Sequence, residues 1–230
     1  MEDKRRYMKI KEDKGQKNGG RLCLAERLLS SIFFCLLLSS SFFLVSCSEE
    51  DSTADEFENW QERNTAAIDQ WASNSSLRKI RVYTQDDTST GKNSDYIYVQ
   101  VLEAGDGTES PLFTDTVRVA YRGKLIPTTN YADGYVFDET YLGDFSWHTA
   151  GMSTMSIGGG STGVVSGFAT ALMNMHKGDR WLVYIPYQLG YNASSQGTVT
   201  AYSNLIFDIA LLDYWHPGDP HPTFRARIRN

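Results

Sequence analysis

Two stretches of the chain carry aromatic side chains beside a single acid, which is the composition of a binding pocket. The first stretch covers residues 117–123 and 134–138, and the second covers 163–172 and 181–186. Together they supply several aromatics, one acid and a short helix, but no obvious nucleophile or metal-binding cluster. An aromatic-lined site without reactive groups suits a reaction that breaks no covalent bond.

Strands predominate among the elements that must position these residues. Residues 96–102, 117–121 and 181–185 alternate between apolar and polar side chains, and residues 205–212 form the most apolar run. Alternation with period two is typical of strands that are buried on one face. We therefore predict about five antiparallel strands that hold one helix on their concave face, which is an α+β arrangement.

The predicted helix begins at Ser166, a residue type that caps helix N-termini. Phe168, Ala171 and Met175 fall on one face at helical spacing, together with Leu172, and Gly178 follows as a stop signal. This helix would bury its apolar face against the sheet.

A second, amphipathic helix is predicted from residue 56 to residue 73. Its stripe consists of Phe57, Trp60, Asn64, Ile68 and Trp71. The stripe could pack on the domain or on a second copy of the chain. Alternatively, Trp60 and Trp71 could form a platform for a partner or a sugar, although aromatic stripes at helical spacing usually bury themselves.

The N-terminal segment has the charge order of a secretory signal. A basic opening precedes an uncharged run over residues 28–46, which ends at Cys47. This junction resembles the lipobox of bacterial lipoproteins, in which the signal is cut before a cysteine that becomes lipidated. A short transmembrane anchor is the alternative, because 19 residues reach the lower end of a spanning length.

Cysteine usage agrees with the lipoprotein interpretation. Cys23 and Cys35 lie in the leader, so the mature chain would keep only Cys47 and could form no internal disulfide. The acidic residues 48–51 resemble the tether of surface lipoproteins of the Bacteroidetes type. We therefore predict a lipid-anchored protein of the cell envelope, at the outer membrane, that is either surface-exposed or faces the periplasm.

The charge balance argues against nucleic acid as a partner. Removing nine of the 22 basic residues and five of the 28 acidic residues with the leader leaves 13 and 23, a net charge of about −10. A surface this acidic lacks the basic face that neutralises phosphates. In the tail, His216, Asp219 and His221 have the residue types of metal ligands, but no spacing that fixes a geometry, and we predict no metal site there.

Several motifs, taken in order, resemble the FKBP-type peptidyl-prolyl cis-trans isomerases. The matching pieces are residues 117–123, 134–138, 163–172, 175–179, 184–186, Tyr191 and 204–212. The resemblance implies a half-open, twisted antiparallel sheet wrapped around one short helix. It gives the domain layout 1–46 (signal peptide), 47–76 (lipidated cysteine, tether and helix), 77–214 (FKBP-like domain) and 215–230 (tail rich in Pro and Arg).

The resemblance also implies a set of site residues. The residues that correspond to its catalytic positions are Tyr121, Phe137, Asp138 and Tyr191, and those that correspond to its substrate-binding positions are Val164, Val165, Phe168, Val199 and Phe207. Asp138 would either contact substrate or hold neighbouring side chains, and Phe168 stands where many members have Trp. Tyr141, Phe145 and Trp147 could supply a further wall of the same groove.

The implied activity is isomerisation of X–Pro bonds in envelope or secreted proteins, without a cofactor or a metal. Proline-containing proteins would be the substrates, and a macrolide inhibitor would bind in the same pocket. Two alternatives remain open. The domain could hold peptides without turnover, as a chaperone module, or it could be an accessory protein of an envelope assembly.

Overall fold

The computed structural model describes residues 56–85, 90–158 and 163–220. The predicted signal peptide, Cys47, the acidic tether and His221 lie outside these ranges. Among the described residues, no helix has the length and apolar character needed to cross a membrane.

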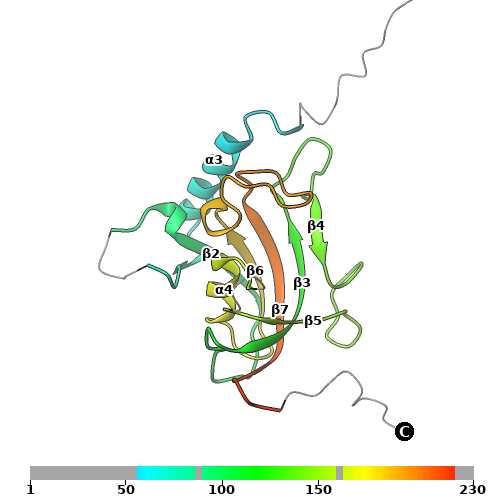
Figure 1. Cartoon of the computed structure of the whole chain (residues 1–230). Coiled ribbons are helices and arrows are strands. Elements are labelled where there is room, and N and C mark those ends of the chain that lie inside the picture. Colours follow the sequence, from blue (N-terminus) through cyan, green and yellow to red (C-terminus); the bar gives the residue numbers. More distant parts are fainter. Residues whose placement is uncertain (1–55, 86–89, 159–162, 221–230) are drawn as a thin grey trace, which may run out of the picture. The chain divides into compact units, whose positions relative to one another are not determined.

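Seven antiparallel strands of the described chain form one sheet (Figure 1). They are β1 (Arg78–Arg81), β2 (Tyr96–Glu103), β3 (Thr116–Lys124), β4 (Val136–Glu139), β5 (Ser153–Ser156), β6 (Arg180–Ile185) and β7 (Leu205–Trp215). The strand order is β1-β2-β6-β7-β3-β4, and β5 pairs with the first half of β3. The predicted α+β class is confirmed. The four predicted strands are β2, β3, β6 and β7, whereas β1, β4 and β5 had no clear alternation of their own.

Side-chain alternation gives this sheet two different faces. On β3, Val117 and Val119 point into the hydrophobic core, while Ala120 between Val119 and Tyr121 packs on the opposite side. On β7, Phe207 and Ile209 belong to the same core. We call the face with this core the inner face and the opposite one the outer face. Because successive residues of a strand point to opposite faces, each strand contributes to both.

Helix α4 (Ser166–Leu172) packs on the inner face, where Phe168 and Leu172 are buried in the core. Gly167 permits the close approach of the helix to β6, because a Cβ there would lie 2.3 Å from Cγ2 of Ile185. The prediction that Ser166 caps this helix is wrong. The N-cap is Val165, and the Ser166 hydroxyl instead donates to the carbonyl oxygen of Leu189 at 3.1 Å.

Helix α3 (Trp60–Ser73) begins four residues later than predicted, because the preceding Asn59 adopts a left-handed backbone with φ 52°. The helix packs on the domain. Near its end, Trp71 contacts the rings of Tyr98 and Tyr184, with centroids 6.3 and 5.1 Å apart. Two short 3-10 turns, η1 (Asn93–Asp95) and η3 (Tyr187–Leu189), complete the described elements.

A buried pair of asparagines fixes α3 to the start of β7. The side-chain oxygen of Asn64 accepts the backbone N–H of Asn204 at 2.8 Å, and the Asn204 amide donates to the Asn64 carbonyl at 2.7 Å. Asn204 also accepts the backbone N–H of Tyr187 at 2.9 Å. Both asparagines are fully buried, so their hydrogen bonds have no water to replace them.

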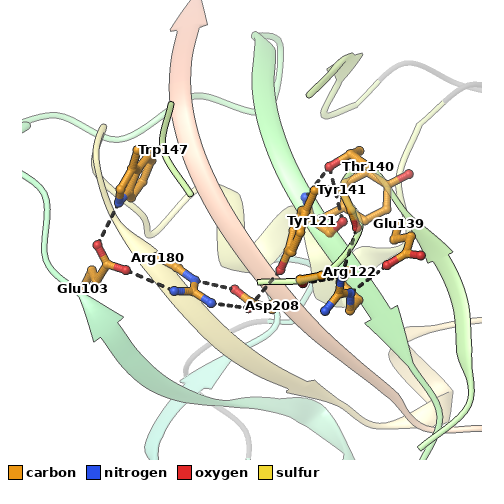
Figure 2. Close-up of polar contacts among 10 residues, drawn as sticks. Glu103, Tyr121, Arg122, Glu139, Thr140, Tyr141, Trp147, Arg180 and Asp208 are labelled. Carbon is orange, nitrogen blue, oxygen red and sulfur yellow. Dashed lines mark hydrogen bonds and ion pairs between the residues drawn. The ribbon is translucent and has the colours of Figure 1, made fainter. Parts of the chain in front are cut away.

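The outer face carries a polar network in place of the predicted pocket wall (Figure 2). Arg180 donates to both carboxylate oxygens of Asp208, at 3.0 and 2.7 Å, and to Glu103 at 3.1 Å. The hydroxyl of Tyr141 donates to Asp208, and the indole of Trp147 donates to Glu103. Tyr141, Trp147 and the neighbouring Phe145 therefore pack on the outer face, and their assignment to the groove was wrong.

Replacing Asn64 with leucine is expected to lower the free energy of unfolding by about 2–3 kcal/mol, because it leaves the buried N–H of Asn204 without an acceptor. Urea denaturation measures the loss. Thr65→Ala is the matched control. The side chains of Asn64 and Thr65 both donate to the carbonyl oxygen four residues back in the helix, but Thr65 is exposed. Its expected change is within about 0.5 kcal/mol. Equal effects of the two substitutions would contradict the role of the buried pair.

Candidate aromatic binding site

The packing of the aromatic site requires a glycine at position 123. This residue of β3 faces inward, opposite Phe207 of β7. A Cβ at Gly123 would lie 2.6 Å from Cζ of Phe137 and 2.6 Å from Cε1 of Phe207. Real Cβ atoms do not approach carbon so closely, so glycine is what allows both rings to sit over the strand.

A bulge in the pairing of β3 with β4 brings two consecutive residues of β4 to the site. Gly123 pairs with Asp138, but the next residue, Lys124, pairs with Val136, so Phe137 is the extra residue. An extra residue interrupts the alternation of the strand and redirects a side chain. Phe137 contacts the Phe207 ring, and Asp138 contacts the Tyr121 hydroxyl.

Four aromatic rings pack edge to face in this region. The centroid of Phe207 lies 4.9 Å from that of Phe168, 5.4 Å from that of Phe137 and 6.1 Å from that of Tyr121. Tyr121 also lies 5.9 Å from Phe168. Phe168 and Phe207 are almost fully buried, whereas Tyr121 and Phe137 are half-buried. The two buried rings form the floor, and the two half-buried rings form the walls.

The single acid of the site is held by the Tyr121 hydroxyl, which donates to Oδ2 of Asp138 at 2.7 Å. Burial raises the pKa of the Tyr121 phenol well above its usual value, and the hydrogen bond and the negative charge of Asp138 raise it further. Tyr121 is therefore a neutral donor at physiological pH. Asp138 is exposed, so one of its oxygens can be approached from solvent.

Tyr191 approaches the site from the segment between η3 and β7. Burial raises the pKa of its phenol, and the charge of Asp138 contributes to the shift. Val199, in the same segment, is 3% exposed and belongs to the core cluster. Val199 is the last residue of a tight turn. Gln196 and Val199 exchange backbone hydrogen bonds of 2.9 and 2.8 Å around Gly197, whose φ of 56° suits the first central residue of a two-residue loop.

Eight of the nine residues implied by the family resemblance lie in or against one core cluster, and the ninth is hydrogen-bonded to one of them. Phe168, Val199 and Phe207 are buried members of the core cluster, and Tyr121, Phe137, Val164, Val165 and Tyr191 are partly buried against it. Asp138 joins them through Tyr121. Gly123 is the last residue of the matched motif 117–123, but the sequence indicated neither its role in the ring packing nor the bulge at Phe137. Neither a missing side chain nor a shifted register leaves a periodic signal.

A separate cleft of about 640 Å³ opens on the outer face, between α3 and the sheet. Its lining includes Arg63 and Trp71 from α3, with Arg122, Tyr184 and Asp208 from the strands. These strand residues alternate with the inward-facing residues, so this cleft and the aromatic site lie on opposite faces of the sheet.

Two tail residues whose side chains are of metal-ligand type, His216 and Asp219, form hydrogen bonds within the protein. His216 Nδ1 lies 2.8 Å from Oδ1 of the buried Asp115, and its backbone N–H donates to Asp219 at 3.1 Å. The hydrogen bond to Asp115 and the charge of that carboxylate raise the pKa of His216. Within the residues described, no group of three His, Cys, Asp or Glu side chains is placed to hold a metal ion.

Comparison with known proteins agrees with this geometry. Residues 107–212 match the model of the FKBP-type peptidyl-prolyl cis-trans isomerase family. Over 114 residues the chain is 37% identical to the FKBP-type isomerase FkpA of Escherichia coli, a match that covers 50% of this chain and 36% of FkpA. It is 32% identical to the macrophage infectivity potentiator of Trypanosoma cruzi over 114 residues, or 49% and 50% of the two chains.

Solved structures show the same fold. The crystal structure of Escherichia coli FkpA superposes with a TM-score of 0.50 at 24% identity, covering 84% of this chain and 74% of that one. The fold and the aromatic site thus define an FKBP-like domain. Residues 107–212 are the part of the chain that is similar to the FKBP-type peptidyl-prolyl cis-trans isomerase family. The chain spans about a third to a half of the length of the curated relatives named above.

The raised pKa of Tyr121 predicts a loss of stability at alkaline pH. In the unfolded chain a tyrosine ionises near pH 10, while the folded site keeps the phenol protonated to higher pH. Its contribution is complete below pH 10 and is lost as the pH rises above it, because the unfolded state then releases a proton that the folded state retains. We expect the free energy of unfolding to fall as the pH rises from about 10 upward, and to fall less steeply in Tyr121→Phe. Urea denaturation over this range measures both slopes, and equal slopes would refute the expectation.

Proposed function

We propose that this protein accelerates cis–trans isomerisation of X–Pro bonds in other proteins. The observation that carries the proposal is the set of four edge-to-face rings, with the neutral Tyr121 phenol bonded to Asp138 beside it. The matched family supports the same activity. Proline-containing segments of envelope or secreted proteins would be the substrates, and no cofactor is required.

The reaction is a rotation, and this explains why an apolar pocket is sufficient. Rotation about an X–Pro bond has a barrier of roughly 18–20 kcal/mol, because the twisted amide loses its resonance. Without catalysis the exchange takes tens to hundreds of seconds. A twisted amide is less polar than a planar one, so an environment with little water favours the transition state over the ground state.

Each residue of the site then has a physical role. Phe168 and Phe207 form the floor on which the proline ring lies, and Phe137 and Tyr121 stand at its sides. Val164, Val165 and Val199 would limit water around the prolyl bond. The Tyr191 hydroxyl donates a hydrogen bond to a substrate carbonyl and holds it during rotation. Asp138 orients Tyr121, and a macrolide inhibitor would occupy the same pocket.

In a prolyl-peptide exchange assay, the purified protein without residues 1–46 is expected to exceed the spontaneous rate. Tyr191→Phe should lower kcat/KM about tenfold, the effect of losing one hydrogen bond worth about 1.4 kcal/mol. Phe137→Ala should lower it at least as much, because it removes a wall of the pocket. Tyr184→Phe and Phe145→Ala are matched controls, since both residues lie on the outer face.

The outcomes separate the functional classes. No acceleration by the folded wild-type protein would reject the enzyme. Binding of a proline peptide that is lost in Phe137→Ala, without turnover, would then identify a peptide-holding module. Equal losses from inner-face and outer-face substitutions would show that the site is misplaced.

We also propose that an acyl chain on Cys47 anchors the protein to the outer membrane of the cell envelope. The support comes from the sequence, in which a basic opening and an uncharged run of residues 28–46 lead to this cysteine. The segment 48–51 contains three acidic residues, Glu49, Glu50 and Asp51, and favours exposure on the cell surface over the periplasmic face.

Cys47→Ser is expected to abolish incorporation of a labelled fatty acid and to release the protein from the membrane fraction or leave its precursor uncleaved. Membrane fractionation with metabolic acyl labelling measures both effects. Ser48→Ala, at the adjacent position, should retain the label. If fully processed Cys47→Ser protein remained membrane-bound, the acyl anchor would be rejected. An unlabelled wild-type protein that kept its leader would instead favour the short transmembrane anchor.

A further inference from the structure

Helix α3 lies outside the segment that matches the isomerase family, yet it contacts the loop that carries two of the site residues. The family match covers residues 107–212, whereas α3 spans Trp60–Ser73. The loop in question covers residues 191–203, between η3 and β7, and includes Tyr191 and Val199. We call it the site loop.

Trp60 makes the direct contact with this loop. Its indole N–H donates to the hydroxyl of Ser203 at 2.8 Å, and this hydrogen bond is buried. The Ser203 hydroxyl in turn donates to the carbonyl oxygen of Thr200 at 2.6 Å, next to Val199. Trp60 is 5% exposed and belongs to the same core cluster as Val199. The indole therefore holds the C-terminal half of the site loop.

The N-terminal half of the site loop is connected to helix α3 through Tyr187. The backbone N–H of Asn192 donates to the Tyr187 carbonyl at 2.8 Å, and the N–H of Tyr202 donates to the Asn192 carbonyl at 2.8 Å. The N–H of Tyr187 is itself bound by Asn204, which pairs with Asn64 of α3. Both ends of the site loop thus reach α3 through chains of hydrogen bonds, in which the links made by Trp60 and by the Asn64–Asn204 pair are buried.

We propose that α3 positions the site loop, and with it Tyr191 and Val199, through the Trp60–Ser203 hydrogen bond. This inference rests on the proposed isomerase function for its effect on turnover. Trp60 is a positioning residue: it acts through Ser203 and the loop. A site whose supporting residues are fixed loses less entropy when substrate is bound in the reactive geometry.

The test compares Trp60→Phe and Ser203→Ala with Trp71→Phe in the protein without residues 1–46. Trp71 is the other tryptophan of α3, but it packs on Tyr98 and Tyr184 of the outer face. We expect both Trp60→Phe and Ser203→Ala to lower kcat/KM about tenfold. Trp71→Phe should leave kcat/KM unchanged even if it lowers global stability.

Hydrogen exchange provides a readout that does not depend on turnover. The amides of Val199 and Tyr202, which bond within the loop, should exchange about tenfold faster in Trp60→Phe and Ser203→Ala. Amides in the middle of β7, such as that of Ile209, should be unchanged. Ser203→Thr keeps the hydroxyl and should restore both the exchange rates and kcat/KM to wild-type values.

Both substitutions remove the Trp60–Ser203 hydrogen bond, and Ser203→Ala also removes the bond to Thr200. The double variant should therefore be less impaired than the sum of the two single effects. Loop exchange at wild-type rates in Ser203→Ala would overturn the proposal, as would equal effects of Trp60→Phe and Trp71→Phe on the loop. If the wild-type protein showed no turnover, the isomerase function would fail, while loop exchange would still decide the role of α3.

Discussion

The antiparallel pairing of β3 with β7 is the constraint on which the rest of the structure depends. The two strands stay paired from Thr116 with Trp215 to Lys124 with Ile206, and Figure 1 shows them curving side by side. Alternation along this ladder places Tyr121, Gly123 and Phe207 on the inner face and Arg122 and Asp208 on the outer face. A shift of the register by one residue would exchange the two sets.

The two faces of the sheet consequently differ in the side chains they carry. The inner face supplies an apolar floor of aromatic rings, where the proposed rotation of a prolyl bond would take place away from water. The outer face supplies hydrogen bonds and ion pairs, of which the Glu103–Arg180–Asp208 chain joins β2, β6 and β7 (Figure 2). Charged groups on the outer face hold the strands together without entering the site, where their charge would attract water.

Helix α3, which lies outside the segment that matches the family, contacts residues associated with both faces of the sheet. Its C-terminal end covers Tyr98 and Tyr184 on the outer face, while Trp60 and Asn64 reach the loop and strand that lead to the inner face. An added helix can therefore affect the site without contributing a side chain to it. The buried Asn64–Asn204 pair makes this attachment specific, because an apolar residue at either position would leave a buried polar group without a partner.

The sequence by itself determined the α+β class and the four main strands, and it named the aromatic residues that the structure packs around Phe207. Period-two alternation and the ordered motifs around Tyr121, Phe137 and Phe168 are local patterns, which can be recognised in the sequence without the structure. Only the tertiary structure decided that Tyr141 and Trp147 belong to the outer face, because a loop without periodicity can cross to either side of a sheet. It alone also showed the bulge at Phe137, the close approach of two rings to Gly123 and the hydrogen bond from Trp60 to Ser203. Each of these depends on contacts between residues far apart in the chain, and such contacts leave no pattern in the local sequence.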